Sequence, residues 1–206
     1  MSSKSVLVVC VSLLLVSLIG CGAVTSDITF FQNEEWKADT TLVLNPQENA
    51  QLGATLEAEL QKRAAQAKNE GLVLNWSKSK QDENTAYRIT AEGAGWNELN
   101  KFAFDNQAEL TTNGNQITVA YRSLGFGARA LTLKLTGGSI VSSNADEVKG
   151  NTAIWYNLGS SLNGVQAVLT PASKSPISGV PCIGGAAILA LIPFGLVRYT
   201  RRKHQT

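Results

Sequence analysis

The feature that most constrains this chain is an apolar run near its N-terminus, from Val6 to Ile19. A short start that carries Lys4 precedes the run, and the small residue Gly20 closes it. A charged start, an apolar middle and a small residue before the cleavage point are typical of a secretory signal peptide. We therefore expect residues 1–20 to be removed and the remaining chain to fold outside the cytoplasm.

The end of this run, Leu18-Ile19-Gly20-Cys21, resembles the lipobox of bacterial lipoproteins. In those proteins the cysteine receives a diacylglycerol and becomes the first residue of the mature chain. The resemblance implies that Cys21 is lipidated, that residues 21–26 form the acylated N-terminus, and that the protein sits at the bacterial cell membrane. Cys10 lies inside the apolar run and is expected to be inert.

Cysteine and histidine are absent from the middle of the chain. The cysteines are Cys10, Cys21 and Cys182, and the single histidine is His204. An exported domain without an internal cysteine has no internal disulfide, so its apolar core must hold it together. The same absence excludes histidine acid–base catalysis, a cysteine nucleophile and zinc sites built from histidine or thiolate. We expect no cofactor, no metal and no enzyme, although a hydrolase with two carboxylates stays open.

The formal net charge of +2 conceals a separation of charge along the chain. Of the 18 basic residues, Lys4 is in the signal peptide and four are in the C-terminal tail. The region between keeps 13 basic and all 16 acidic residues, a net charge of −3. Because no basic face of the kind that binds nucleic acid is present, we expect no nucleic-acid partner.

A second apolar run lies near the C-terminus, at residues 183–197. With the three preceding residues it approaches the roughly 20 residues that a spanning helix needs. The basic tail, residues 198–206, follows at once and indicates a cytoplasmic end by the positive-inside rule. We predict a transmembrane helix at 182–197 after a tether at 171–181. A buried C-terminal helix, or a sorting signal processed at Pro181-Cys182, is the alternative.

The region between the two apolar runs combines one long helix with many strands. Asn45-Pro46 is a good start for a helix, because Asn caps and Pro suits the first helical position. Most other segments alternate apolar and polar residues as strands do, most clearly from Trp36 to Leu44, and Asn113-Gly114 predicts a hairpin. With a short helix at 96–105, this predicts an α+β domain over residues 27–170. Its sheet is expected to be mainly antiparallel and curled, with about nine strands.

The segment Leu135–Leu158 resembles a motif of LppM-like domains in bacterial envelope proteins. In that motif a glycine turn leads to a valine and Ser-Asn, and later to Gly-Asn-Thr-x-x-Trp. The resemblance implies an envelope-anchored α+β domain for which lipid or glycolipid binding has been suggested, and it implies no catalytic residue. Because turns and core explain these residue types, we interpret the motif as a marker of fold. The matching residues are Gly138, Val141, Ser143, Asn144, Gly150, Asn151, Thr152 and Trp155.

The stretch most suited to touch a membrane is the apolar, glycine-rich tip between Arg122 and Arg129. Apolar side chains flanked by arginines suit contact with lipid head groups or the mouth of an apolar cavity. The candidate contacts are Arg122, Leu124, Phe126 and Arg129, and a buried connection between strands is the alternative. The four tryptophans are expected in the core, with a ligand pocket as the alternative.

Three functions remain in competition. The first is a binding module for a lipid, glycolipid or other envelope component at the outer face of the cytoplasmic membrane. The second is a protein-interaction or scaffold domain of an envelope complex, and the third is an enzyme. An apolar cavity of about a few hundred Å³ favours the first function. An exposed apolar patch or an open sheet edge favours the second, and a buried pair of carboxylates in a cleft favours the third.

Overall fold

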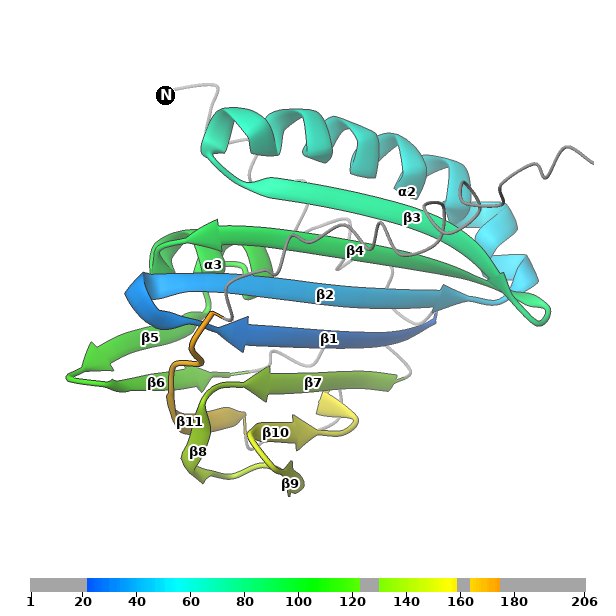
Figure 1. Ribbon diagram of the computed structural model, residues 1–206. Helices are drawn as coiled ribbons and strands as arrows, with labels where there is room; N and C mark the ends of the chain where they lie inside the picture. Colours follow the sequence, from blue (N-terminus) through cyan, green and yellow to red (C-terminus); the bar gives the residue numbers. More distant parts are fainter. Residues whose placement is uncertain (1–21, 123–129, 159–163, 175–206) are drawn as a thin grey trace, which may run out of the picture. The chain divides into compact units, whose positions relative to one another are not determined.

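The structure is a computed structural model that describes residues 22–122, 130–158 and 164–174 (Figure 1). The chain divides after Lys174 into two units, and the described residues all belong to the first. The predicted signal peptide, the segment 182–197 and the basic tail lie outside the described residues. Within the described ranges, no helix is long and apolar enough to cross a membrane.

Eleven strands form two sheets in the described part of the chain. The large sheet has the strand order β3-β4-β2-β1-β7-β10-β9, and the small sheet has the order β5-β6-β11-β8. The strands are β1 (Ala23–Phe30), β2 (Glu35–Leu44), β3 (Val73–Gln81), β4 (Asn84–Ala94), β5 (Ala108–Asn113), β6 (Gln116–Tyr121), β7 (Ala130–Thr136), β8 (Ser139–Ser143), β9 (Glu147–Lys149), β10 (Thr152–Trp155) and β11 (Val165–Thr170). The α-helices are α2 (Pro46–Ala67) and α3 (Trp96–Ala103), and the short 3-10 helices are η1 (Gln32–Glu34) and η2 (Lys68–Glu70).

The predicted fold class is therefore wrong. Instead of an α+β domain with one curled sheet of about nine strands, the described chain is mostly β, with two sheets. The predicted transmembrane helix falls outside the described residues. The sheets separate at Gly137-Gly138. The Gly137 amide donates to the Asn151 carbonyl beside β10, whereas the Gly138 amide donates to the Thr170 carbonyl of β11, at 3.0 and 2.7 Å. Alternation identifies strands but does not reveal which sheet each strand joins, because the side-chain period is two in both.

The helix α2 begins where Asn45-Pro46 predicts. The Asn45 side chain accepts a hydrogen bond from the Glu48 amide at 2.9 Å, and the Glu48 side chain accepts one from the Asn45 amide at 2.8 Å. This capping box satisfies two backbone donors at the helix start. The apolar side of α2 packs on the large sheet in a small cluster, made by Leu42, Leu44, Leu56, Leu60 and Tyr87.

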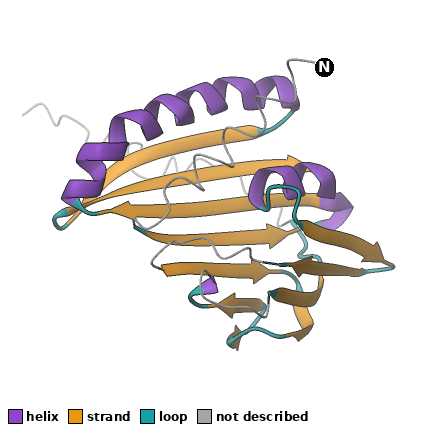
Figure 2. Cartoon of the chain, turned by 180° about the vertical axis from the view of Figure 1, so that it is seen from behind, coloured by secondary structure: helices purple, strands orange, loops and turns teal. Residues whose placement is uncertain are grey.

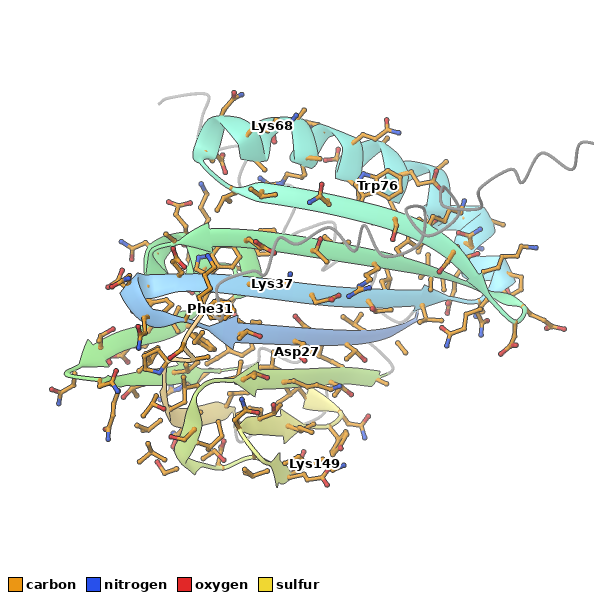
Figure 3. The ribbon with its side chains drawn as sticks, in the orientation of Figure 1. Asp27, Phe31, Lys37, Lys68, Trp76 and Lys149 are labelled. Atoms are coloured by element: carbon orange, nitrogen blue, oxygen red, sulfur yellow. The ribbon has the colours of Figure 1, made fainter. Side chains whose placement is uncertain are left out.

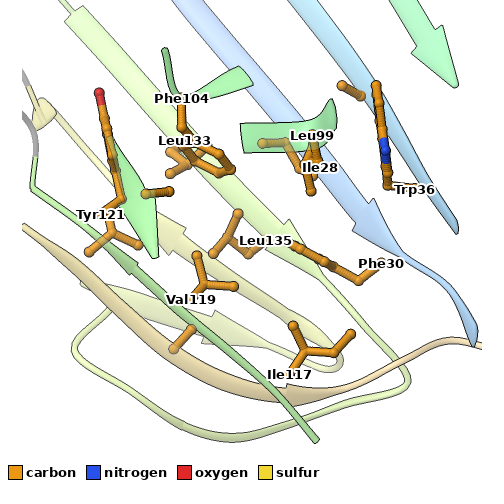
Figure 4. Packing of buried hydrophobic residues seen from close by; sticks show 14 of the residues in the cluster. Ile28, Phe30, Trp36, Leu99, Phe104, Ile117, Val119, Tyr121, Leu133 and Leu135 are labelled. Atoms are coloured by element: carbon orange, nitrogen blue, oxygen red, sulfur yellow. The ribbon is translucent and has the colours of Figure 1, made fainter. Parts of the chain in front are cut away.

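The main core lies on the same inner face of the large sheet, under α3 and the small sheet (Figures 2 and 4). Ile28 and Phe30 of β1 are 1% and 0% exposed. Trp36, Trp96 and Trp155 belong to this core, whereas Trp76 is half-buried beside the small cluster. Labelled members in Figure 4 are Ile28, Phe30, Trp36, Leu99, Phe104, Ile117, Val119, Tyr121, Leu133 and Leu135.

Gly137 provides a test of the separation between the sheets. A Cβ at this position collides with the Thr170 carbonyl oxygen, a backbone atom that cannot move without disturbing β11. Gly137→Ala should therefore lower the free energy of unfolding by at least about 2 kcal/mol.

Gly114→Ala is the control for this prediction. Gly114 has φ +59, but an added Cβ meets nothing within 4 Å. This control should cost only the backbone strain, about 1 kcal/mol. Urea unfolding of the two variants measures both values, and equal losses contradict the assigned role of Gly137.

Candidate functional site

A shallow, open hollow on the outer face of the large sheet is the candidate site. Figure 3 labels Asp27, one of its lining residues. Its volume is about 370 Å³. The lining residues are Thr25 and Asp27 of β1, Asp39 and Thr41 of β2, and Arg88 of β4. These three strands are neighbours in the sheet, so the hollow lies on its central part, on the face opposite the core.

The hollow follows from two short sequences in mirrored order, Thr25-Ser26-Asp27 and Asp39-Thr40-Thr41. The antiparallel register of β1 and β2 sets threonine opposite threonine and aspartate opposite aspartate. Because alternate residues of a strand face opposite sides, the middle residues point inward. There the hydroxyls of Ser26 and Thr40 form a hydrogen bond of 2.9 Å.

Arg88 is held in the hollow by Asp39. The Arg88 Nε donates to both Asp39 carboxylate oxygens, at 3.0 and 3.1 Å, and Nη2 also donates to Oδ2. The Arg88 side chain is 63% exposed, so the pair contributes little stability. A guanidinium has five N–H donors, so this geometry fixes the group while leaving donors free for a ligand.

The surroundings of Asp27 disfavour the charged form of its carboxyl group. Burial raises its pKa above the usual 3.8, and the neighbouring Asp39 raises it further, while a hydrogen bond from Thr136 and the charge of Lys134 act against this. The Thr136 hydroxyl donates to Asp27 Oδ1 at 3.2 Å. Like charges directly opposite each other on paired strands are destabilising. A carboxyl group with a perturbed pKa in a hollow is a candidate functional group.

The structure describes few of the predicted membrane contacts. Arg122 follows β6 and is exposed. Cys21, Leu124, Phe126 and Arg129 lie outside the described residues. Among the described residues, no three histidine, cysteine or acidic side chains gather to hold a metal ion.

The residues of the LppM-like motif make contacts that connect the two sheets. Asn144, after β8, accepts hydrogen bonds through Oδ1 from Trp155 Nε1 at 2.9 Å and from the Gln166 amide at 2.8 Å. Its Nδ2 donates to the Gly164 carbonyl at 3.1 Å. Further along, Asn151 Nδ2 donates to the Gly137 carbonyl at 2.8 Å.

The other motif residues lie in strands or turns. Gly138 binds β11 through its amide, and Gly150 has φ +60. The hydroxyls of Thr152 and Thr136 are 3.0 Å apart, and the Ser143 hydroxyl accepts from the Ala145 amide at 3.4 Å. Val141 is 51% exposed.

Sequence reasoning missed all five residues of the hollow. A usable signal was present, because the alternation of β2 already places Asp39 and Thr41 on the polar side of the strand. The mirrored order in β1 and β2 adds to it. Arg88 carried no such signal, since only the pairing of β4 with β2 brings it opposite Thr41.

Comparison with known proteins adds one finding. No family model matches the chain, and no curated protein matches it. The fold is similar to the NMR structure of the folded domain of LppM from Mycobacterium tuberculosis, with a TM-score of 0.51 and 13% sequence identity. The similarity covers 74% of this chain and 91% of that one.

The chain has an LppM-like fold. This confirms, at the level of the fold, the resemblance indicated by Leu135–Leu158. At this sequence identity the LppM-like fold says nothing about a ligand, so the function of the hollow has to be argued from its own residues.

Asp27→Asn should stabilise the domain at neutral pH. Because the pKa of Asp27 is raised in the folded state, the folded chain binds the proton more tightly than the unfolded chain. The contribution of Asp27 to stability therefore falls as pH rises above about 3.8. Asparagine removes the charge, so the free energy of unfolding at pH 7 should rise by up to about 1 kcal/mol.

The gain from Asp27→Asn should vanish near pH 3, where the wild-type carboxyl is protonated in both states. The matched control is Asp39→Asn, which removes the same repulsion but also weakens the pair with Arg88. The free energy of unfolding of Asp39→Asn at pH 7 should therefore rise by less than that of Asp27→Asn. Urea unfolding at both pH values measures the effects, and a loss of stability for Asp27→Asn at pH 7 contradicts the account.

Proposed function

We propose that this protein is a bacterial envelope lipoprotein whose domain, outside the cytoplasm, binds the hydroxyl-rich head group of a membrane glycolipid without catalysing a reaction. The observation that carries the proposal is the composition of the hollow. Its five lining residues all present polar groups, and the volume is of the size that small ligands occupy.

The chemistry of the hollow suits a sugar or another polyol. The carboxylates of Asp27 and Asp39 accept hydrogen bonds, the Arg88 guanidinium donates them, and the hydroxyls of Thr25 and Thr41 do both. A polyol hydroxyl also donates and accepts, so each can pair with two kinds of group at once. The lining contains no aliphatic or aromatic residue to pack against an acyl chain, which favours recognition of a head group over storage of a lipid tail.

Attachment to the membrane is supported by the N-terminal sequence. The lipobox resemblance of Leu18-Ile19-Gly20-Cys21 implies acylation of Cys21, and the LppM-like fold of the described chain agrees with an envelope protein. A diacylglycerol supplies two acyl chains, and two chains are the usual requirement for stable anchoring.

Catalysis by the two aspartates is the weaker interpretation. Asp39 is bound by Arg88 through both carboxylate oxygens, so it is not free to act as a base or nucleophile. The hollow is also open to solvent, whereas carboxylate pairs that hydrolyse glycosides act on a substrate held in a cleft. Binding requires neither a free base nor the exclusion of water.

A protein-interaction domain is the alternative function. Of the four large apolar side chains that are exposed in the described chain, three lie between β8 and the residue after β10: Val141 by 51%, Val148 by 50% and Tyr156 by 44%. The fourth, Val73 of β3, is 57% exposed. Exposed apolar side chains that gather in one region mark interaction surfaces. A partner protein would use this region rather than the hollow, so substitutions in the two places separate the functions.

Arg88→Gln tests the proposed binding. Loss of the guanidinium should weaken binding of a glycolipid with a hexose or inositol head group by about tenfold, equivalent to about 1.4 kcal/mol. The full-length acylated protein is titrated with that glycolipid in mixed micelles, with phosphatidylcholine as the reference lipid. Asp27→Asn should weaken binding as well, although it stabilises the domain.

Lys37→Gln is the matched control. Lys37 pairs with Glu92 at 2.7 Å on the same face and across the same two strands, but neither residue lines the hollow. Its removal should leave glycolipid binding unchanged. Equal losses for Arg88→Gln and Lys37→Gln, or no preference for the glycolipid over phosphatidylcholine, reject the proposal.

A further inference from the structure

The folded domain begins almost at the lipidated position. Only Gly22 separates Cys21 from Ala23, the first residue of β1. Gly22 is itself buried and has φ +90. A Cβ on Gly22 would lie 2.7 Å from the Val43 carbonyl oxygen, so the chain is already packed on the end of β2 at this point. The lipidated cysteine therefore has no flexible linker.

Because this connection is short, acylation of Cys21 would hold one particular end of the large sheet close to the membrane. Two residues of extended chain span at most about 7 Å. An acyl group on Cys21 therefore holds Ala23 close to the lipid head groups. Register places the end of β2 and the start of β7 beside it, since Ala23 pairs with both Val43 and Ala130 (Figure 1).

We infer that this end of the sheet, the anchor rim, rests on the surface of the lipid bilayer and that the strands of the large sheet point away from it. The inference rests on the proposed acylation of Cys21. The rim consists of Ala23, Val43, Pro46 and Ala130, which carry no charge and are at least partly exposed.

The orientation explains how the hollow reaches its ligand. Thr25 and Thr41 lie two residues from the rim, and the aspartates lie two residues further. At about 3.3 Å per residue, the hollow starts about 7 Å above the rim and extends to about 13 Å. A sugar head group that projects from the same leaflet reaches this height, whereas the acyl chains stay below it.

The acidic turn between β3 and β4 limits how closely this end of the sheet approaches the bilayer. Asp82 and Glu83 lie at the same end of the sheet as the rim, because Lys80 and Leu44 both pair with Thr85. Anionic head groups repel these carboxylates. The β1 and β7 side of the rim is therefore expected to approach the bilayer more closely than the β3 and β4 side.

Two exposed glutamines provide a matched test. Gln47 lies at the start of α2 beside the rim, and Gln32 lies in η1 at the opposite end of β2. Since β2 has 10 residues, the two ends are about 30 Å apart. Each glutamine is replaced by cysteine in full-length protein that carries Cys182→Ser, and a fluorescent label is attached to the new thiol.

The labelled proteins are reconstituted in phosphatidylcholine vesicles that contain lipid with a nitroxide on its head group. The label on Gln47→Cys should lose most of its fluorescence, and the label on Gln32→Cys should lose none. Insertion of a long glycine–serine linker between Cys21 and Gly22 should remove this difference, because the acyl group then no longer holds the rim at the bilayer.

Mass spectrometry of the N-terminal peptide separates the possible failures. An acylated Cys21 with equal quenching at both positions, or with stronger quenching at position 32, overturns the orientation alone. An unacylated Cys21 overturns both the proposed function and the orientation. An acylated Cys21 with quenching only at position 47, lost on linker insertion, supports the orientation and the acylation on which it rests.

Discussion

The strand β1 occupies the centre of the large sheet, paired with β2 on one side and in parallel with β7 on the other. Its inward residues Ile28 and Phe30 are fully buried in the main core, and no cysteine is present in the described chain to supplement that core. Its outward residues Thr25 and Asp27 line the hollow. Its first residue is two positions from Cys21, the proposed site of acylation. The eight residues of β1 therefore contribute to the core and to the hollow, and they begin beside the proposed anchor.

The outer face of this strand carries an unfavourable arrangement of like charges that the fold does not require. A sheet face in contact with water is stable with threonines alone, yet β1 and β2 place two aspartates opposite each other. Asp39 is compensated by Arg88, whereas Asp27 keeps a raised pKa despite the hydrogen bond from Thr136. Local conflicts of this kind are expected at functional sites, where binding rather than stability determines the residue. The conflict is the physical reason for assigning a ligand to this hollow.

Sequence patterns predicted the local elements better than their arrangement. The cap at Asn45-Pro46 and the hairpin turn both depend on neighbouring residues. The cap lies where the pattern predicted it, and the turn lies at Gly114-Asn115, one residue after the predicted Asn113-Gly114. The arrangement depends on contacts between distant residues, such as Ala23 with Ala130, and on the change of sheet at Gly137-Gly138. The alternation of apolar and polar residues is the same in both sheets and does not reveal which sheet a strand joins. The prediction of a single sheet was therefore wrong. The aspartates of β1 and β2 were missed although alternation places them on the outer face, whereas the position of Arg88 depends on the pairing of β4 with β2.

The most direct test of the account is native mass spectrometry of the full-length protein, released from bacterial membranes in a mild detergent. The account predicts that the wild-type protein carries one glycolipid, which is lost on delipidation and returns when the glycolipid is added. Arg88→Gln should carry little or none. A wild-type protein that retains only bulk phospholipid, or that carries the same glycolipid when Arg88 is replaced, contradicts the assignment of the hollow as a head-group site.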